Sequence, residues 1–262
     1  MEIQRVKISV ENQIALVALN RPDKHNALDM PMFYSIIGTL EKIKRDNNIR
    51  VVIVSGEGDS FSSGLDIKSV MKSRVNIFKL LWKWWPRNAN LAQRVTIGWR
   101  QLSVPVIMVI HGKCWGGGMQ IALGGDFRIA HPDASLSIME SKWGLIPDMG
   151  GTPALQENVS LDQAMLLAMT ADVISAEQAL QQNLITQISI EPLKMAYELA
   201  EKLIERSPDT NRLIKKLYHK TWCNKQGNIL ANETFNQWKV LLSKNQKIAV
   251  RKARGDKDID YV

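Results

Sequence analysis

The chain has 262 residues, 45% of them hydrophobic, so it can bury a sizeable core as one large domain or as a domain with an appendage. Its two cysteines, Cys114 and Cys223, fit neither a metal motif nor a disulfide framework, and no apolar run is long enough to span a bilayer, so we expect a soluble, cytoplasmic protein without a membrane partner. The formal net charge of +8 favours acidic partners, and composition alone leaves nucleic acid and a phosphate-bearing small molecule equally open.

The N-terminal part predicts a hairpin, a polar loop and an amphipathic helix. Runs typical of strands cover residues 3–10 and 14–19, and a proline-containing loop follows over 20–26. Asp29 can cap a helix that begins near Pro31 and ends at 44–48. The apolar residues that repeat at helical spacing in it are Phe33, Ile36, Ile37, Leu40 and Ile43.

A strand, a glycine-rich loop and a further element then follow each other twice. A buried strand over 51–54 precedes the loop GEGDSFSSG (56–64), after which Leu65-Asp66-Ile67 begins the next element. A second strand, 106–110, leads to three glycines and a buried helix over 119–123. Glycine lets the backbone approach a ligand closely, and the first N–H groups of a helix have no partner inside it. The amides around Gly117 can therefore bind an oxygen that gains negative charge.

The segment between these two units, 71–102, is the least patterned part of the chain. It holds Trp82, Trp84, Trp85 and Trp99 among lysines and arginines. We expect a mobile helical segment whose tryptophans pack against the core. A lid over an apolar ligand is the alternative, and both roles are compatible.

The C-terminal half predicts short strands followed by helices. Strands are expected over 127–130, 136–140 and 185–190, with helical sequence over 161–183. Beyond residue 193 only helices are expected, with a break at Ser207-Pro208, and the charged end, 254–262, is expected to be loose. This places a soft boundary near residue 190, between a core of residues 1–190 and a helical region of residues 191–262.

Common nucleotide and metal motifs are missing from the sequence. There is no G-x-G-x-x-G, no P-loop and no G-x-S-x-G, since Ser62-Ser63-Gly64 lacks the upstream glycine. The four histidines, His25, His111, His131 and His219, have no metal-like spacing, so we interpret them as structural and expect no metal.

Three polar residues are the candidates for chemistry. Glu140 lies between an apolar run and Trp143, where a water-poor wall would raise its pKa toward a useful acid-base range, although a surface glutamate at the end of an edge strand is an equal alternative. Asp148 follows a proline in a glycine-bounded loop, where it could also be a turn or cap residue. Gln120, on the helix after the glycines, can donate and accept hydrogen bonds but cannot carry a proton.

Four segments together resemble the crotonase superfamily, which is also called the enoyl-CoA hydratase/isomerase family. They are NRPDKHNALD (20–29), FSSGLDI (61–67), HGKCWGGGMQIALGGDFRIA (111–130) and MESKWGLIPDMGGT (139–152). They occur in the family's order over almost the whole chain, and four matches in register are far more specific than any one alone.

This resemblance implies an α/β fold, namely a crotonase-like spiral of repeated β-β-α units, with a C-terminal helical region that caps the active site and mediates homotrimers or dimers of trimers. The substrate would be an acyl-CoA thioester, and because coenzyme A is part of that substrate, no separate cofactor is expected. The resemblance places the thioester oxygen between the N–H groups of Leu65 and Gly117. Contacts with coenzyme A would fall at Lys24, Asn26, Ala27, Asp66, Ile67 and Lys68, which gives the basic charge a small-molecule explanation without nucleic acid.

The match is partial where the chemistry takes place. The resemblance implies that hydratases use two glutamates twenty positions apart to hold water, and here the second is Glu140 whereas the first position holds Gln120. Hydratase is the commonest activity of the family, but Gln120 favours an isomerase in which Glu140 moves one proton alone. A dienoyl-CoA isomerase that uses Glu140 and Asp148 is an alternative, although Gln120 departs from that pattern as well. The alternative of another class is a non-catalytic homologue that binds acyl-CoA or RNA.

Overall fold

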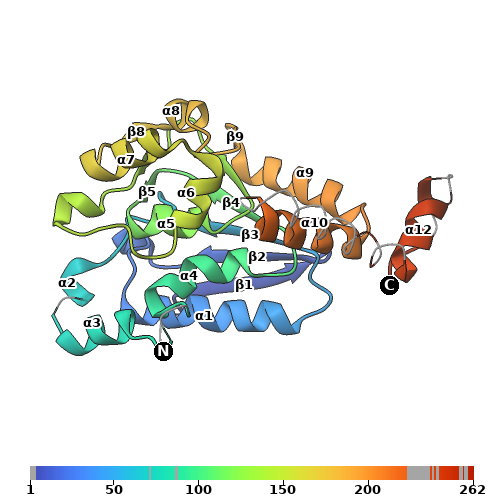
Figure 1. Ribbon diagram of the computed structural model, residues 1–262, viewed down its shortest axis with the longest axis horizontal. Coiled ribbons are helices and arrows are strands. Elements are labelled where there is room, and N and C mark those ends of the chain that lie inside the picture. The colour runs from blue at the N-terminus through green and yellow to red at the C-terminus, as the bar shows by residue number, and fades with distance from the viewer. Residues whose placement is uncertain are drawn as a thin grey trace.

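The computed structural model (Figure 1) describes residues 4–70, 72–85, 88–222, 237, 239, 242–253, 256 and 259–262, so Cys223 lies outside the described residues. Its elements, in chain order, are β1 (Val6–Glu11), β2 (Ile14–Leu19), η1 (Pro22–Lys24), α1 (Met30–Arg45), β3 (Val51–Gly56), α2 (Ile67–Val70), α3 (Arg74–Leu81), α4 (Leu91–Arg100), β4 (Val106–Ile110), β5 (Lys113–Trp115), α5 (Gly117–Leu123), β6 (Phe127–Ala130), β7 (Ser135–Ser137), η2 (Glu140–Trp143), α6 (Thr152–Asn158), α7 (Leu161–Thr170), β8 (Ile174–Ser175), α8 (Ala176–Gln181), β9 (Gln187–Ile188), α9 (Pro192–Ile204), α10 (Pro208–Thr221) and α12 (Lys244–Ala253).

The strands form two sheets, and the chain moves between them. The larger sheet has the order β1-β2-β3-β4-β6-β9, in which β1 pairs antiparallel with β2 and every later pair is parallel. The smaller sheet has the order β5-β7-β8. Because β4 and β6 lie in the larger sheet while β5 and β7 follow them in the smaller one, successive units repeat across both sheets. The predicted α/β fold with repeated β-β-α units is confirmed.

The central strands β3 and β4 of the larger sheet are buried on both faces, which explains their continuous apolar sequence runs. Along β3 the side chains alternate, so that Val52 and Val54 join the core beneath α1 and α4 whereas Val51 and Ile53 face α9. This period of two follows from the strand geometry, and burial on both faces is typical of parallel sheets covered by helices. Figure 1 shows the same layering, with α1 and α4 on one side of the sheet and α9 on the other.

The hairpin and the first helix form where the sequence predicts them. β1 and β2 are joined by Asn12 and Gln13, which both have positive φ angles of 49° and 67°. Asp29 caps α1, because its side chain accepts a hydrogen bond from the N–H of Met32 at 2.9 Å.

The region 161–183 is not one helix. Ala171 adopts a left-handed conformation with φ 56° and ends α7, after which Ile174 pairs with Leu136 of β7 as part of β8. Residues 176–181 then form α8 as a separate helix. Helical periodicity was a correct guide to both helices, but only pairing with a distant strand decides that the chain between them is extended.

The expectation that the tryptophans of 71–102 pack against the core is correct for one of them and wrong for three. Trp99 is fully buried on α4, whereas Trp82, Trp84 and Trp85 expose 52%, 89% and 64% of their surface. The three exposed residues follow the end of α3, where Trp82 already has an extended backbone and the chain leaves the core.

The region after residue 190 begins with a helix that belongs to the packing of the sheet. Ala196 and Ala200 of α9 are buried against Val51, Ile53 and Ile107. Among the described helices, none is both long enough and apolar enough to cross a membrane. The end of the chain is also less loose than expected, because Val262 exchanges two hydrogen bonds with the side chain of Asn245.

Candidate active site

A cavity of about 440 Å³ brings together residues from three separate parts of the sequence. One wall is the loop after β3, the second is the start of α5, and the third is the segment from η2 to Met149, while side chains of α1, α2, α3 and α4 complete it. Its lining includes Leu65, Gly117, Glu140 and Asp148. A larger cavity of about 760 Å³, between α4 and α10, contains none of the residues that the sequence analysis selected.

The two glycine-rich loops are held side by side by backbone hydrogen bonds. The N–H of Ser62 donates to the carbonyl of Lys113 at 2.9 Å, and the N–H of Trp115 donates to the carbonyl of Ser62 at 3.0 Å. Gly64 has a φ of 87°, and a Cβ atom at this position would lie 2.6 Å from the Trp115 carbonyl oxygen and 3.2 Å from the nitrogen of Gly117. The two loops therefore meet at a distance that only glycine permits.

The N–H groups of Leu65 and Gly117 are both left without an acceptor in the described part of the chain. Leu65 is bridged to Leu28, whose N–H donates to the carbonyl of Gly64 and whose carbonyl accepts from the N–H of Asp66. Gly117 is the first residue of α5, so its N–H has no partner inside the helix. Two free donors on the same cavity, one of them at a helix N-terminus, are suited to an oxygen that carries negative charge.

Glu140 lies in the wall of this cavity and is itself almost completely buried. Only 9% of the residue is exposed, which excludes the alternative of a surface glutamate. Its Oε1 accepts a hydrogen bond from the Nε2 of Gln120 at 2.5 Å, while its buried Oε2 has no hydrogen-bond partner among the described residues. Burial raises the pKa of Glu140, Asp148 adds to this shift through its charge, and the Gln120 hydrogen bond opposes it.

Gln120 is fixed in one orientation by backbone groups far from it in the sequence. Its Oε1 accepts hydrogen bonds from the N–H of Met149 at 2.9 Å and from the N–H of Gly151 at 3.2 Å. Because both partners can only donate, the oxygen of the amide must face them and the NH₂ group must face Glu140. Gln120 thus acts as a donor that orients the Glu140 carboxylate. The sequence had no signal for this, since the two backbone donors lie in an irregular loop.

Asp148 lines the same cavity from the loop before α6 and is itself exposed. Partial burial raises the pKa of its carboxyl group. The structure thereby places the second candidate acid in the same cavity as the Glu140 carboxylate.

Five of the six residues predicted to contact coenzyme A line a second, open cavity of about 510 Å³, and they are Lys24, Ala27, Asp66, Ile67 and Lys68. This cavity adjoins the first, because Leu65, Ile67 and Trp143 line both. It also includes Lys72, which the sequence analysis missed although it lies four residues after Lys68. The sixth residue, Asn26, is not brought to either cavity.

Asn26 instead holds its loop together from inside. It is fully buried, and its Nδ2 donates to the carbonyls of Glu57 and Ser60 at 2.9 and 2.7 Å. Its Oδ1 accepts from the N–H of Arg21 at 2.7 Å. The side chain therefore has no free group for a ligand, and its part in the site is to fix the backbone of the loop that carries Lys24 and Ala27.

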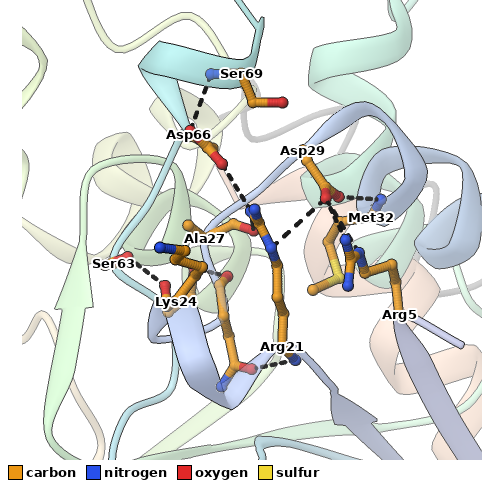
Figure 2. Close-up of polar contacts among 11 residues, drawn as sticks. Arg5, Arg21, Lys24, Ala27, Asp29, Met32, Ser63, Asp66 and Ser69 are labelled. Atoms are coloured by element: carbon orange, nitrogen blue, oxygen red, sulfur yellow. Dashed lines mark hydrogen bonds and ion pairs between the residues drawn. The ribbon is translucent and has the colours of Figure 1, made fainter. Parts of the chain in front are cut away.

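Arg21, which the sequence analysis also missed, joins the walls of the second cavity (Figure 2). Its Nη1 donates to Asp66 Oδ2 at 2.8 Å and to the carbonyl of Ala27 at 3.1 Å, and its Nε lies 3.6 Å from Asp29. Burial would raise the pKa of Asp66, but the hydrogen bond and charge of Arg21 outweigh it and lower the pKa. The Asp66 carboxylate is thus ionised and already paired with Arg21, so its role is to hold the loop in position.

The histidines contact polar groups of the fold and are not gathered around a metal site in the described part of the chain. In the described part of the chain, no group of three His, Cys, Asp or Glu side chains is placed to hold a metal ion. His25 contacts the hydroxyl of Ser60, His111 the carbonyl of Gly58 and His219 the carboxylate of Asp126.

Comparison with known proteins gives the same result by sequence and by structure. Residues 9–252 match the family model described as enoyl-CoA hydratase/isomerase. The chain is 32% identical to a short-chain-enoyl-CoA hydratase of Clostridium acetobutylicum, over 82% of this chain and 81% of that protein, and 30% identical to a probable enoyl-CoA hydratase of Bacillus subtilis, over 81% of each. The crystal structure of an enoyl-CoA hydratase from Bacillus anthracis superposes with a TM-score of 0.88 at 25% identity, covering 98% of this chain and 99% of the other.

Proposed function

Because the chain belongs to the enoyl-CoA hydratase/isomerase family, we propose that it shifts the double bond of an enoyl-CoA thioester, with Glu140 carrying the proton. The observation that supports this reaction best is the pair formed by Glu140 and Gln120. Glu140 keeps a buried oxygen, Oε2, without a partner, whereas the neighbouring Gln120 is an amide held as a donor by two backbone N–H groups. Hydration by two carboxylates would require a second carboxylate at position 120, where this chain has Gln120. The transfer of one proton between two carbons requires only one carboxylate.

The proposed reaction begins with a 3-enoyl thioester. Glu140 Oε2 takes a proton from C2, and the electron pair moves into a conjugated enolate whose oxygen accepts hydrogen bonds from the N–H groups of Leu65 and Gly117. The same proton then returns from Glu140 to C4, which moves the double bond to C2–C3 and restores the carboxylate. No water and no redox partner enter the balance.

The substrate's coenzyme A would lie along the open cavity beside the catalytic one. Lys24, Lys68 and Lys72 line it and supply positive charge for phosphate groups.

We also infer a homo-oligomer, a trimer or a dimer of trimers. The support is an apolar surface on α7, which contacts η2, and its exposed members are Leu161, Met165, Leu166 and Met169.

The test compares a 3-enoyl-CoA with a 2-enoyl-CoA as substrate, and it includes a variant that carries a carboxylate at position 120. We expect the wild-type protein to convert a 3-enoyl-CoA to the 2-enoyl isomer, followed by the absorbance of the conjugated thioester, and to hydrate a 2-enoyl-CoA at least about 10²-fold more slowly, the low end of what one acid-base group contributes. The variant Gln120→Glu is expected to raise hydration relative to isomerisation. Gln120→Met is the control, because it has similar length but neither donates to Glu140 nor carries a proton. Rapid hydration by the wild type would overturn the isomerase assignment.

A second candidate function rests on Asp148. This carboxyl group lines the same cavity, so a conjugated diene placed between Glu140 and Asp148 could be protonated at one end and deprotonated at the other. The protein would then be a dienoyl-CoA isomerase. Conversion of a 3,5-dienoyl-CoA that is lost in Asp148→Asn, with 3-enoyl conversion retained, would favour this candidate.

The pH dependence of the reaction follows from the environment of Glu140. Glu140 acts as a base only when ionised, and burial raises its pKa, so kcat/KM is expected to increase with pH through an inflection above the ordinary glutamate value of 4.5. The charge of Asp148 raises this pKa further, so the variant Asp148→Asn is expected to move the inflection to lower pH. Asp172→Asn serves as a control, because Asp172 is exposed and lines neither cavity of the site. An inflection that moves upward or stays in place in Asp148→Asn would contradict the assignment of the base.

A further inference from the structure

The end of α3 and the chain after it present a surface of large apolar side chains to solvent. This surface, here called the tryptophan face, consists of Val75, Phe78, Trp82, Trp84 and Trp85, which are 52% to 89% exposed. The rings of Phe78 and Trp82 lie 5.0 Å apart, so part of the face is packed together. Figure 1 places α3 at one end of the long axis of the molecule, with α12 at the other.

The opposite side of α3 is apolar as well, and its side chains line a cavity. Ile77 and Leu80 line the cavity that contains Glu140. A helix that is apolar on both sides is normally buried on both sides, either in a core or in lipid. The tryptophan face has no protein cover among the described residues, so the apolar surface that it leaves in water is large for one short segment.

The charged residues in the stretch of sequence that forms the tryptophan face are all positive. Arg74, Lys79 and Lys83 lie within or beside it, and their side chains form no ion pair with any described residue. The sequence contains no Asp or Glu between Asp66 and Asp126. Tryptophan and lysine side chains both suit a boundary between an apolar layer and water. Indole rings have an apolar body with one polar N–H, and lysine stems can lie along an apolar layer with the ammonium in water.

We propose that the tryptophan face docks on an anionic phospholipid bilayer. Trp84 and Trp85 lie at the depth of the headgroups, the apolar side chains of α3 enter the boundary of the acyl chains, and the three cations Arg74, Lys79 and Lys83 meet the lipid phosphates. Two-fold pairing of this face with the same face of a second copy is a poorer alternative, because it brings like charges together without an acid to offset them. Such binding needs only one face of the protein and no helix that crosses the bilayer.

Docking in this way places the Glu140 cavity next to the bilayer, since the two sides of α3 face the lipid and the cavity respectively. An apolar acyl chain could then pass between the membrane and the cavity along one helix. This consequence rests on the proposed function, whereas docking itself does not.

The test uses the full-length protein and vesicles without any thioester. Protein is mixed with vesicles of phosphatidylcholine alone, or of phosphatidylcholine with phosphatidylglycerol, and the bound fraction is measured by flotation. We expect binding to the anionic vesicles that weakens with salt. Trp84→Ser/Trp85→Ser is expected to reduce it by more than about tenfold through lost apolar burial. Each charge removed in Lys79→Gln/Lys83→Gln should reduce it about fivefold. Quenching of tryptophan fluorescence by brominated acyl chains should disappear in the tryptophan variant.

Trp222→Ser is the matched control, because Trp222 is 61% exposed but lies at the end of α10, away from α3. It should bind vesicles as the wild type does, and unchanged thermal unfolding of all variants verifies that the fold is intact. Lack of binding to anionic vesicles overturns the proposal, and so does binding that the Trp84 and Trp85 substitutions leave unchanged. A fall in molar mass by light scattering in Trp84→Ser/Trp85→Ser, without vesicle binding by the wild type, would assign the face to contact between copies. Isomerase assays are read separately, so either result can fail without the other.

Discussion

Replacing Glu140 with Gln is expected to lower kcat for double-bond transfer by about 10²- to 10⁴-fold, the contribution of a positioned general base. The substitution leaves the shape of the residue almost unchanged. The new amide oxygen can still accept from Gln120 Nε2, so the contact between the two side chains is retained while the proton carrier is lost. The loss should appear in kcat, with thioester affinity measured by calorimetry changed only slightly.

The fold of Glu140→Gln should be at least as stable as that of the wild type. Burial raises the pKa of Glu140, which means that its ionised form is disfavoured in the folded state at neutral pH. A neutral residue of the same size removes this cost, so the free energy of unfolding at neutral pH is expected to stay equal or to increase. Glu198→Gln, at an exposed position on α9, is the control for activity. Activity of Glu140→Gln close to that of the wild type would exclude Glu140 as the base.

Replacing Gly64 with Ala is expected to lower kcat/KM by about 10²- to 10³-fold, the usual loss when one donor to a developing oxyanion is displaced. A Cβ atom on Gly64 would lie 2.6 Å from the Trp115 carbonyl oxygen and 3.2 Å from the Gly117 nitrogen, and neither backbone atom can yield without moving a loop. The substitution therefore separates the N–H of Leu65 from that of Gly117. Kinetics with the 3-enoyl thioester would measure the loss.

The control for Gly64→Ala separates the clash from the cost of the backbone conformation. Gly144 has a comparable positive φ of 67°, but a Cβ atom there would meet nothing within 4 Å. Gly144→Ala should lower the free energy of unfolding by about 1 kcal/mol, the cost of a left-handed conformation for a residue with a Cβ. Gly64→Ala should lower it by more. Equal losses in stability would mean that the close approach of the two loops is not what requires glycine at position 64.

The pair of Gln120 and Glu140 explains how one position can change the reaction without changing the fold. Gln120 is buried and satisfied by two backbone donors, so an amide at this position costs little and holds the loop of Met149 in place. The same contacts would also suit a carboxylate, which accepts hydrogen bonds in the same way. The difference is confined to the side that faces Glu140, where an amide donates and a carboxylate repels.

Local sequence determined much of the fold because its signals act over a few residues. The cap of α1 by Asp29 depends on one side chain and the N–H three residues later. The burial of β3 on both faces depends on a run of consecutive apolar residues, which places apolar side chains on both faces of the strand. The position of Gly117 at the start of a helix likewise follows from the glycines and the apolar run after them, and the structure puts it on the same cavity as Leu65, Glu140 and Asp148.

What only the tertiary structure decided concerns partners that are distant in the sequence. The side-chain amide of Gln120 could lie in either of two flipped orientations until the N–H groups of Met149 and Gly151 selected the one in which its oxygen accepts from them. Asn26 matched a ligand-binding segment, yet the chain folds over it and uses all of its polar atoms. The tryptophans after α3 had the composition of a core, but no sheet or helix among the described residues covers Trp84 and Trp85. Hydrophobicity and hydrogen-bonding capacity are properties of a residue, whereas burial and the choice of a partner are properties of the packing around it, and that packing is fixed only when the remote segments meet.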